Sequence, residues 1–215
     1  MIGTMRDPTA PGLDPDQDFD RFPAALWESH EGLEPSRRQE LLDLLRDDAL
    51  EAGAKPWVRD ERLQDEMVLL DGAVRLYLRD PRGRTWNTHL LVGPCFFPPL
   101  HLRTRDGRSS LEAEAAKPSR IQRLDAMEFC RIRGECPGLM RLGARLVEEE
   151  MERLRQREER SLGMDLAARV GLFLRERPEV WQSFPNQDIA SHLGVTPEAL
   201  SRALAKLRES ARVME

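Results

Sequence analysis

Residues 186–208 read NQDIASHLGVTPEALSRALAKLR, a run in which almost every position is physically constrained. Ala190 is small enough for two helices to touch there, and Gly194 stands four positions later, where a turn needs a positive φ. Thr196 suits an N-cap, and Pro197 suits the first position of a helix, where a missing N–H costs nothing. Five further positions must be apolar if two short helices are to pack at a steep angle, and they hold Ile189, Leu193, Val195, Leu200 and Ala203. The stretch predicts a helix-turn-helix.

The second helix of this motif carries polar and charged side chains on the face that packing leaves exposed. Arg202 can donate two hydrogen bonds to a guanine edge, Glu198 can accept one from a cytosine amine, and Ser201 can bond a base or a phosphate. We expect the helix to enter the major groove of double-stranded DNA with its N-terminus first. The expected DNA-binding residues are Thr196, Glu198, Ser201, Arg202 and Lys206. Residues 186–188 would then lie near the DNA backbone.

A long helix is predicted over residues 137–160, which contain no Gly or Pro after Gly143 and many Glu and Arg residues. Its apolar residues follow a spacing of three to four and form one narrow stripe. They are Leu139, Leu142, Leu146, Met151 and Leu154. A stripe this narrow on so charged a helix favours contact with an identical partner, and hence a homodimer. The alternative is a surface helix that packs only on its own core.

Residues 57–124 have a β pattern. The run VLLDGAVRLYLRDPRGRTWNTHLL, residues 68–91, alternates apolar Val74 and Leu76 with Arg75 and Tyr77, then turns through residues 80–83, so it predicts a β-hairpin. Short strands are expected near 110–115 and 120–124, which together suggest a small barrel or roll. Upstream, the leucines of residues 36–52 are close to helical spacing, and we expect an amphipathic helix there.

The composition fits a helix-rich protein of the cytoplasm. Of 215 residues, 33% are charged and 6% aromatic, and the net charge of −5 argues weakly against a protein that coats nucleic acid non-specifically. Residues 1–18 hold four acidic residues and three prolines without a signal-peptide core, so we expect a flexible tail. The longest uncharged stretch, residues 85–102, is interrupted by prolines and predicts no membrane helix.

A β-rich domain, a long helix and then this helix-turn-helix resemble the Crp/Fnr family of bacterial transcription regulators. Glu198, Ser201 and Arg202 match the E-x-x-S-R pattern of the Fnr branch, and the segment DGAVRLYLRDPRGR is similar to the family's strand and turn. The resemblance implies a dimer on palindromic TTGA-like half-sites about one helical turn apart, and RNA polymerase as a partner.

The resemblance also implies an α+β fold in which four segments follow one another. They are a flexible tail (1–18), a cyclic-nucleotide-binding-like effector domain built as a β-roll or jelly roll (19–136), a dimerisation helix (137–160) and a helix-turn-helix domain (161–215). The last of these departs from the family pattern, because we expect it to be mostly helical with the wing reduced or absent.

The expected effector site departs from the family pattern. In cyclic-nucleotide binders a carboxylate follows a glycine and an Arg-Ser pair stands about ten residues later. Here the carboxylate position is Pro98, within GPCFFPPLHL, whereas Arg108 and Ser109 stand at the expected distance. Arg108 and Ser109 are therefore the candidate effector-binding residues for a small-molecule ligand, because a guanidinium can still hold an anion. The cofactor and the effector remain unidentified.

The cysteines fit neither a disulfide framework nor a paired zinc site, since Cys95, Cys130 and Cys136 are odd in number and irregularly spaced. Residues 1–50 hold no cysteine, which speaks against the iron–sulfur centre of the oxygen-sensing branch. Cys95 and His101 leave haem open, and Cys130 with Cys136 leaves a thiol switch open.

A cyclic-nucleotide-binding or ligand-binding module acting through protein partners is the alternative to a DNA-binding regulator. An enzyme is not expected, and neither catalytic residues nor a metal site are predicted, because the four histidines are scattered and none pairs with a nucleophile or carboxylate at a recognisable spacing.

Overall fold

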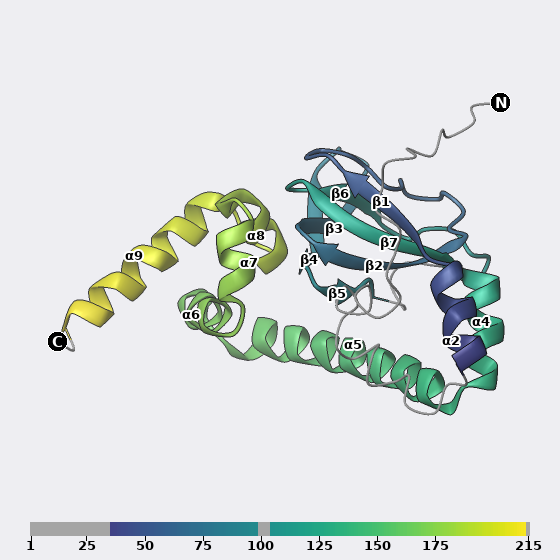
Figure 1. Cartoon of the computed structure of the whole chain (residues 1–215). Coiled ribbons are helices and arrows are strands. Elements are labelled where there is room, and N and C mark those ends of the chain that lie inside the picture. Colours follow the sequence, from purple (N-terminus) through teal and green to yellow (C-terminus); the bar gives the residue numbers. More distant parts are fainter. Residues whose placement is uncertain (1–34, 99–103, 214–215) are drawn as a thin grey trace.

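The chain forms a β-domain, a long connecting helix and a group of C-terminal helices, the α+β arrangement predicted above (Figure 1). The computed structural model describes residues 35–98 and 104–213, so the predicted tail of residues 1–18 lies outside the described part. Within those two ranges, no helix is both long and apolar enough to cross a membrane.

The β-domain consists of two antiparallel sheets, one with strand order β1-β7-β2-β5 and one with strand order β4-β3-β6. Apolar side chains from both sheets fill the space between them, and Leu69, Leu76 and Ile121 are fully buried there beside Trp57. The strands are β1 (Arg46–Leu50), β2 (Asp65–Asp71), β3 (Ala73–Arg79), β4 (Thr85–Val92), β5 (Cys95–Phe96), β6 (Glu112–Ala115) and β7 (Ser119–Asp125). The roll predicted for this segment is confirmed.

The hairpin predicted at residues 80–83 joins β3 to β4. Gly83 adopts a φ of +80°, a region open to glycine but costly for other residues, and its amide donates to the Asp80 carbonyl at 2.9 Å. The alternation predicted along β3 holds only for Val74 to Leu76, because Tyr77 is fully buried and Leu78 is exposed. Tyr77 lies between the guanidinium groups of Arg75 and Arg79, at 4.9 and 5.7 Å from its ring centroid, and these side chains help to bury it completely.

The helix expected over residues 36–52 is wrong in its second half. Helix α2 covers Pro35–Asp43, and the chain then continues as strand β1. Strand β1 pairs along its whole length with β7, which places Leu50 in the core, and Arg123 of β7 donates to Asp48 at 2.9 Å. This pairing with residues about seventy positions away outweighs the local helical spacing of the leucines.

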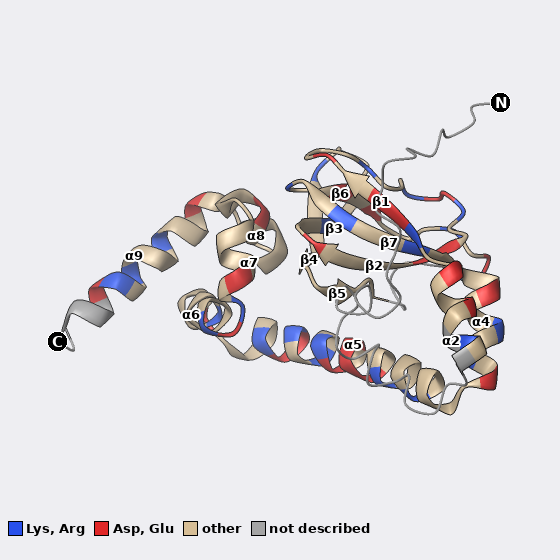
Figure 2. Cartoon of the chain, viewed as in Figure 1, with Lys and Arg blue, Asp and Glu red and all other residues tan. Residues whose placement is uncertain are grey.

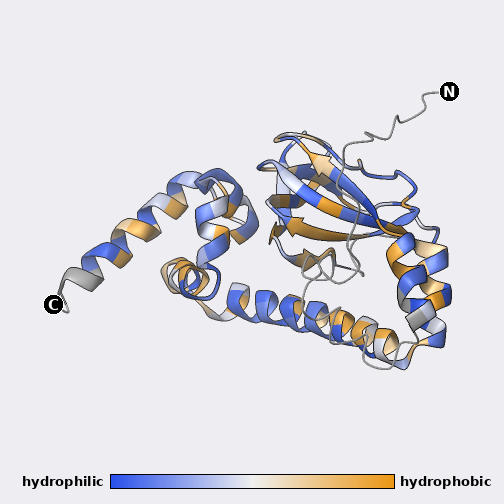
Figure 3. Cartoon of the chain, viewed as in Figure 1, coloured by the Kyte–Doolittle hydropathy of each residue, from blue (hydrophilic) through white to orange (hydrophobic). Residues whose placement is uncertain are grey.

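Helix α5 (Pro137–Gly163) is the predicted long helix, and it follows α4 (Ala126–Glu135), which the sequence did not predict. The first half of α5 is predominantly apolar and the second half predominantly polar (Figure 3). Leu139 and Leu142 are buried against α2, α4 and Leu124 of β7. The apolar residues in the first turns of the predicted stripe therefore pack into the chain's own core.

The C-terminal group comprises α6 (Leu166–Glu176), α7 (Pro178–Ser183), α8 (Asn186–Leu193) and α9 (Pro197–Val213). These helices share an apolar cluster in which Val170, Ile189 and Leu200 are completely buried. The cluster continues onto the β-domain through Ala73 and Leu90. The C-terminal helices are therefore attached to the three-stranded sheet by apolar packing, and in Figure 1 α7 and α8 lie next to β4.

Candidate nucleic-acid interface

The turn between α8 and α9 has the geometry that residues 186–208 predicted. Gly194 ends α8 in the left-handed conformation, with a φ of 73°, and the Val195 amide donates to the Ala190 carbonyl at 2.9 Å. Thr196 then caps α9, because its hydroxyl accepts a hydrogen bond from the Ala199 amide at 3.2 Å. Ala190 is fully buried, as expected of the point where the two helices meet. The predicted helix-turn-helix is present.

Glu198, Ser201 and Arg202 are exposed in the first two turns of α9. Figure 2 shows an acidic residue at the start of this helix, followed by basic residues further along it. A hydrogen bond from its own backbone amide lowers the pKa of Glu198, with further contributions from the Thr196 hydroxyl and the positive charge of Arg202. Glu198 is therefore a carboxylate at neutral pH, and Arg202 stands four positions later on the same helix face. The structure brings together a hydrogen-bond acceptor, a hydroxyl and a forked donor at the start of this helix.

Thr196 and Lys206, two further expected DNA-binding residues, also have contacts within the chain. The Thr196 hydroxyl is engaged in capping α9, although its side chain is exposed. The Lys206 ammonium lies 3.8 Å from the carboxylate of Asp165, which caps α6. Both groups of this pair are about two-thirds exposed, so the ion pair contributes little to stability and Lys206 can exchange it for another anion.

The first helix of the motif is only partly available to a ligand. Asn186 and Gln187 are exposed, but Asp188, expected near the DNA backbone, is buried against the β-domain. Its carboxylate accepts from Arg75 at 2.7 Å and from the Asn87 side-chain amide at 3.1 Å. Asp188 therefore holds α8 on the three-stranded sheet instead of facing outward.

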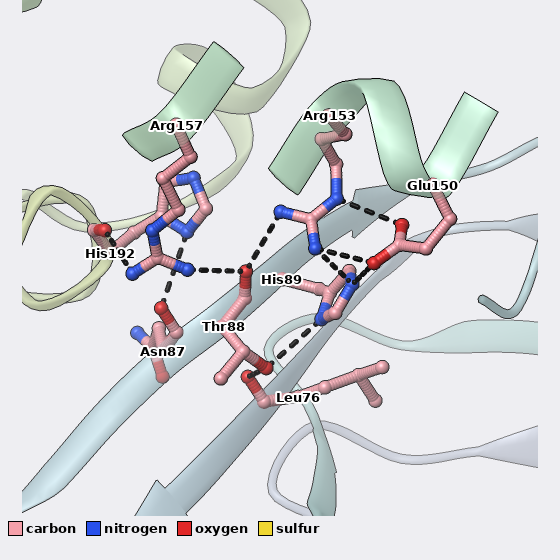
Figure 4. Close-up of polar contacts among 8 residues, drawn as sticks. All are labelled: Leu76, Asn87, Thr88, His89, Glu150, Arg153, Arg157 and His192. Carbon is pink, nitrogen blue, oxygen red and sulfur yellow. Dashed lines mark hydrogen bonds and ion pairs between the residues drawn. The ribbon is translucent and has the colours of Figure 1, made fainter. Parts of the chain in front are cut away.

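A β-bulge in β4 lies where the β-domain contacts the helices. Leu76 pairs with His89 and Tyr77 with Asn87, so Thr88 is an extra residue without a register partner, although its hydroxyl donates to the Leu76 carbonyl at 3.1 Å. The Thr88 carbonyl accepts hydrogen bonds from two arginines of α5, Arg153 at 3.5 Å and Arg157 at 3.4 Å (Figure 4).

Arg157 extends this network to the helix-turn-helix. Its second terminal nitrogen donates to the His192 carbonyl at 3.1 Å, and the His192 ring meets the Asn87 carbonyl at 3.3 Å (Figure 4). Burial, together with the positive charges of Arg157 and Arg153, lowers the pKa of His192 to about 3. His192 is therefore neutral at physiological pH. The β-domain, α5 and α8 meet at this point, which we call the β4 junction: Asn87, Thr88, His89, Glu150, Arg153, Arg157 and His192.

The centre of the β4 junction is a buried charged cluster. Glu150 accepts from Arg153 at 2.6 Å and 2.9 Å, and the same carboxylate lies 3.1 Å from Nε2 of His89 (Figure 4). His89 also contacts the Thr88 hydroxyl at 2.9 Å through Nδ1. The sequence reasoning missed these residues. The available signal was spacing, because Glu150 and Arg153 continue the inward stripe of Leu142 and Leu146 by steps of four and three.

The candidate effector residues Arg108 and Ser109 have different surroundings. Ser109 is fully buried, and its hydroxyl donates to the Leu111 carbonyl within the core. Arg108 is half-exposed, donates to the Asp60 carbonyl at 2.8 Å and lies 3.4 Å from the Asp106 carboxylate. They do not form a shared anion-binding pair in this structure, and neither lines the apolar cavity of about 110 Å³ between the four-stranded sheet and the first half of α5.

The cysteines occupy three different environments. Burial raises the pKa of Cys95 to about 11, so its thiol is protonated and weakly nucleophilic at neutral pH. Cys130 is exposed on α4, whereas Cys136 is buried just after that helix. All three are free thiols, and His101, the other residue considered for haem, lies outside the described residues.

Comparison with solved structures shows which known folds this chain shares. It superposes on FixK2 from Bradyrhizobium japonicum with a TM-score of 0.67 and 21% identity, over 78% of this chain and 86% of that one. A proposed transcriptional regulator of the Crp/Fnr family from Eubacterium rectale gives 0.67 and 19%, over 89% and 88%. A mutant of CooA from Carboxydothermus hydrogenoformans gives 0.65 and 14%, over 80% and 79%. No protein-family model and no curated protein matches the chain. The chain has the fold of these regulators.

Proposed function

We propose that this chain is a sequence-specific DNA-binding transcription regulator of the Crp/Fnr type, which acts as a dimer on palindromic TTGA-like sites. The observation that carries the proposal is the exposed face of α9, where Glu198, Ser201 and Arg202 stand on a correctly formed helix-turn-helix. A forked donor and a carboxylate at the N-terminal end of such a helix suit guanine and cytosine edges in the major groove. The fold shared with known regulators supports the same class of function.

The surface of α5 supports a dimer. A second line of apolar or small residues runs along α5 at alternating steps of four and three, the spacing of a coiled-coil seam, and its member Val147 also lines the apolar cavity. We call this seam the outer stripe: Met140, Ala144, Val147, Met151 and Leu154. Met140 and Met151 are 48% and 56% exposed in the single chain, as expected of side chains that a second α5 would cover. The outer stripe differs from the inward stripe that begins at Leu139 and Leu142.

Replacing Met151 by glutamate tests the dimer. The change places two carboxylates opposite each other in the proposed seam, where each would lose its hydration. We expect the dimer dissociation constant to rise by on the order of 100-fold, measured by sedimentation equilibrium. Met127→Glu is the matched control, because Met127 is 80% exposed on α4 and should leave the dimer intact. A Met151→Glu variant that associates like the wild type would contradict the proposed seam.

We propose that the β-domain receives the regulatory signal and passes it through the β4 junction. Of the two candidate effector residues, Arg108 is the one that can meet an anionic ligand, because the Ser109 hydroxyl is already engaged in the core. Regulation requires an effector that binds one arrangement of the helix-turn-helix more tightly than another. RNA polymerase is the proposed protein partner on DNA, and the cytoplasm is the proposed compartment.

DNA binding by the full chain is tested with a fluorescent duplex that carries a TTGA-like palindrome and with a duplex of the same composition in scrambled order. We expect the palindrome to bind at least about 10³-fold more tightly, the lower end for specific protein–DNA complexes. We also expect affinity to fall steeply as salt rises, by about 0.9 log units per phosphate contact for each tenfold increase. Equal affinity for both duplexes, or no binding, would favour the alternative of a ligand-binding module that acts through protein partners.

A further inference from the structure

The tip of the β3–β4 hairpin, residues 80–84, is an ordered and positively charged loop. The Asp80 carboxylate accepts from the amides of Arg82 and Arg84, both at 2.9 Å, and the Arg84 carbonyl accepts from the Asp80 amide at 2.9 Å. The only acidic side chain of the tip is thus engaged in forming the turn. The side chains of Arg82 and Arg84 are exposed.

The hairpin is bonded directly to the helix-turn-helix. The Ser191 hydroxyl of α8 donates to the Thr85 carbonyl at 3.0 Å and accepts from the Asn87 amide at 3.0 Å. The Asn87 side chain donates to the Asp188 carbonyl at 3.1 Å, next to the ion pair of Asp188 with Arg75. These contacts begin one residue after Arg84, so the tip has a defined position relative to α8.

A cleft of about 330 Å³ lies between the hairpin tip and the starts of α8 and α9. One wall consists of residues 83–86, where the Arg84 guanidinium lies 4.4 Å above the Trp86 ring. The opposite wall contains Gln187, at the start of α8, together with Thr196 and Pro197, at the start of α9. Asp188 also lines the cleft, but its negative charge is matched by Arg75.

The starts of both helices in a helix-turn-helix are where the DNA backbone passes. The arginine-bearing hairpin tip stands at the same edge of the molecule, across the cleft from these helix starts. Guanidinium groups bind phosphate through parallel hydrogen bonds, and stacking on an aromatic ring leaves their N–H groups available. The β-domain thus presents two phosphate-binding side chains beside the proposed reading helix.

We propose that the β3–β4 hairpin is a second DNA-contacting element, which binds backbone phosphates through Arg82 and Arg84 beside each half-site read by α9. This inference rests on the proposed function. It adds a contact made by the β-domain itself, so that the domain proposed to receive the signal also holds DNA. Such contacts strengthen binding to any sequence, because phosphates carry no base identity.

The test compares the salt dependence of DNA binding by full-length wild type and by the double variant Arg82→Gln/Arg84→Gln. Each lost phosphate contact should reduce the slope of log affinity against log salt by about 0.9, hence by up to about 3.6 for two arginines in each of two protomers. The preference for the palindrome over the scrambled duplex should stay unchanged. The double variant Arg82→Lys/Arg84→Lys should recover most of the slope, since lysine retains the charge.

Arg59→Gln/Arg62→Gln is the control, because both residues are exposed between β1 and β2 and the change in net charge is the same. The proposal is overturned if the hairpin variant has the wild-type slope, which would leave the tip as a surface for a protein partner, or if it binds DNA more tightly. It is also overturned if the control pair lowers the slope equally. If the wild type bound no DNA at all, that result would instead contradict the proposed function. Failure of the hairpin proposal can therefore be distinguished from failure of the proposed function.

Discussion

Arg202→Ala is expected to weaken binding to a palindromic TTGA-like duplex by on the order of 30-fold to 10⁴-fold. A bidentate contact between a guanidinium and guanine contributes about 1–3 kcal/mol to discrimination, and a dimer makes it in both half-sites. The Arg202 side chain is exposed on α9, so its truncation to alanine should leave the fold of the helix-turn-helix intact. Fluorescence anisotropy at one fixed salt concentration measures the change.

The specificity of that loss matters more than its size. Binding to a scrambled duplex should change far less, because Arg202 is proposed to read a base and not the backbone. Arg175→Ala removes the same charge from an exposed position near the end of α6 and should leave both affinities nearly unchanged. If Arg202→Ala retained the wild-type preference for the palindrome, α9 would not be the reading helix in the way proposed here.

Glu150→Ala is expected to lower the free energy of unfolding by about 3–5 kcal/mol. The carboxylate is almost completely buried and bridges Arg153 of α5 to His89 of β4. The Arg153 guanidinium already lies 2.8 Å from Nε2 of His89, so removal of Glu150 leaves these two groups in contact without the negative charge beside them, and the desolvation cost of both groups remains. Urea denaturation followed by circular dichroism gives the change.

Two control variants show whether the loss of stability comes from the β4 junction or from the removal of any glutamate on α5. Glu149→Ala changes the neighbouring residue, whose side chain is 64% exposed and lies 3.8 Å from Arg145, and it should cost no more than about 1 kcal/mol. Glu150→Gln keeps the acceptor oxygen and should fall between the two. Equal stabilities for the Glu149→Ala and Glu150→Ala variants would show that the buried cluster does not hold α5 on β4.

The helix-turn-helix could be predicted from sequence because its constraints are local. A glycine with positive φ, a cap and a proline at the first helical position act within about ten residues, and Gly194, Thr196 and Pro197 met them all. Strand β1 could not be predicted in this way. Its conformation depends on pairing with β7, and nothing within residues 46–50 reveals that partner.

The attachment of the helix-turn-helix to the β-domain could not be predicted from the sequence for a similar reason. Asp188 is a polar residue at the start of a helix, and such residues are commonly exposed. Its burial follows from Arg75, more than a hundred residues earlier in the chain, which approaches from the neighbouring sheet. Glu150 was equally ambiguous, since a glutamate among many on a charged helix gives no sign that an imidazole will face it.

The two stripes of α5 have a mechanical consequence. Each position of the inward stripe except Leu142 precedes a position of the outer stripe by one residue, as Leu139 precedes Met140 and Glu150 precedes Met151. Adjacent residues lie about 100° apart around a helix with 3.6 residues per turn. A rotation of α5 about its own axis would therefore turn both stripes by the same angle, because they belong to one rigid helix. In the proposed dimer, a change in the contact between the two α5 helices would therefore reach Glu150 and Arg153, and through Arg157 the backbone of His192 at the end of α8.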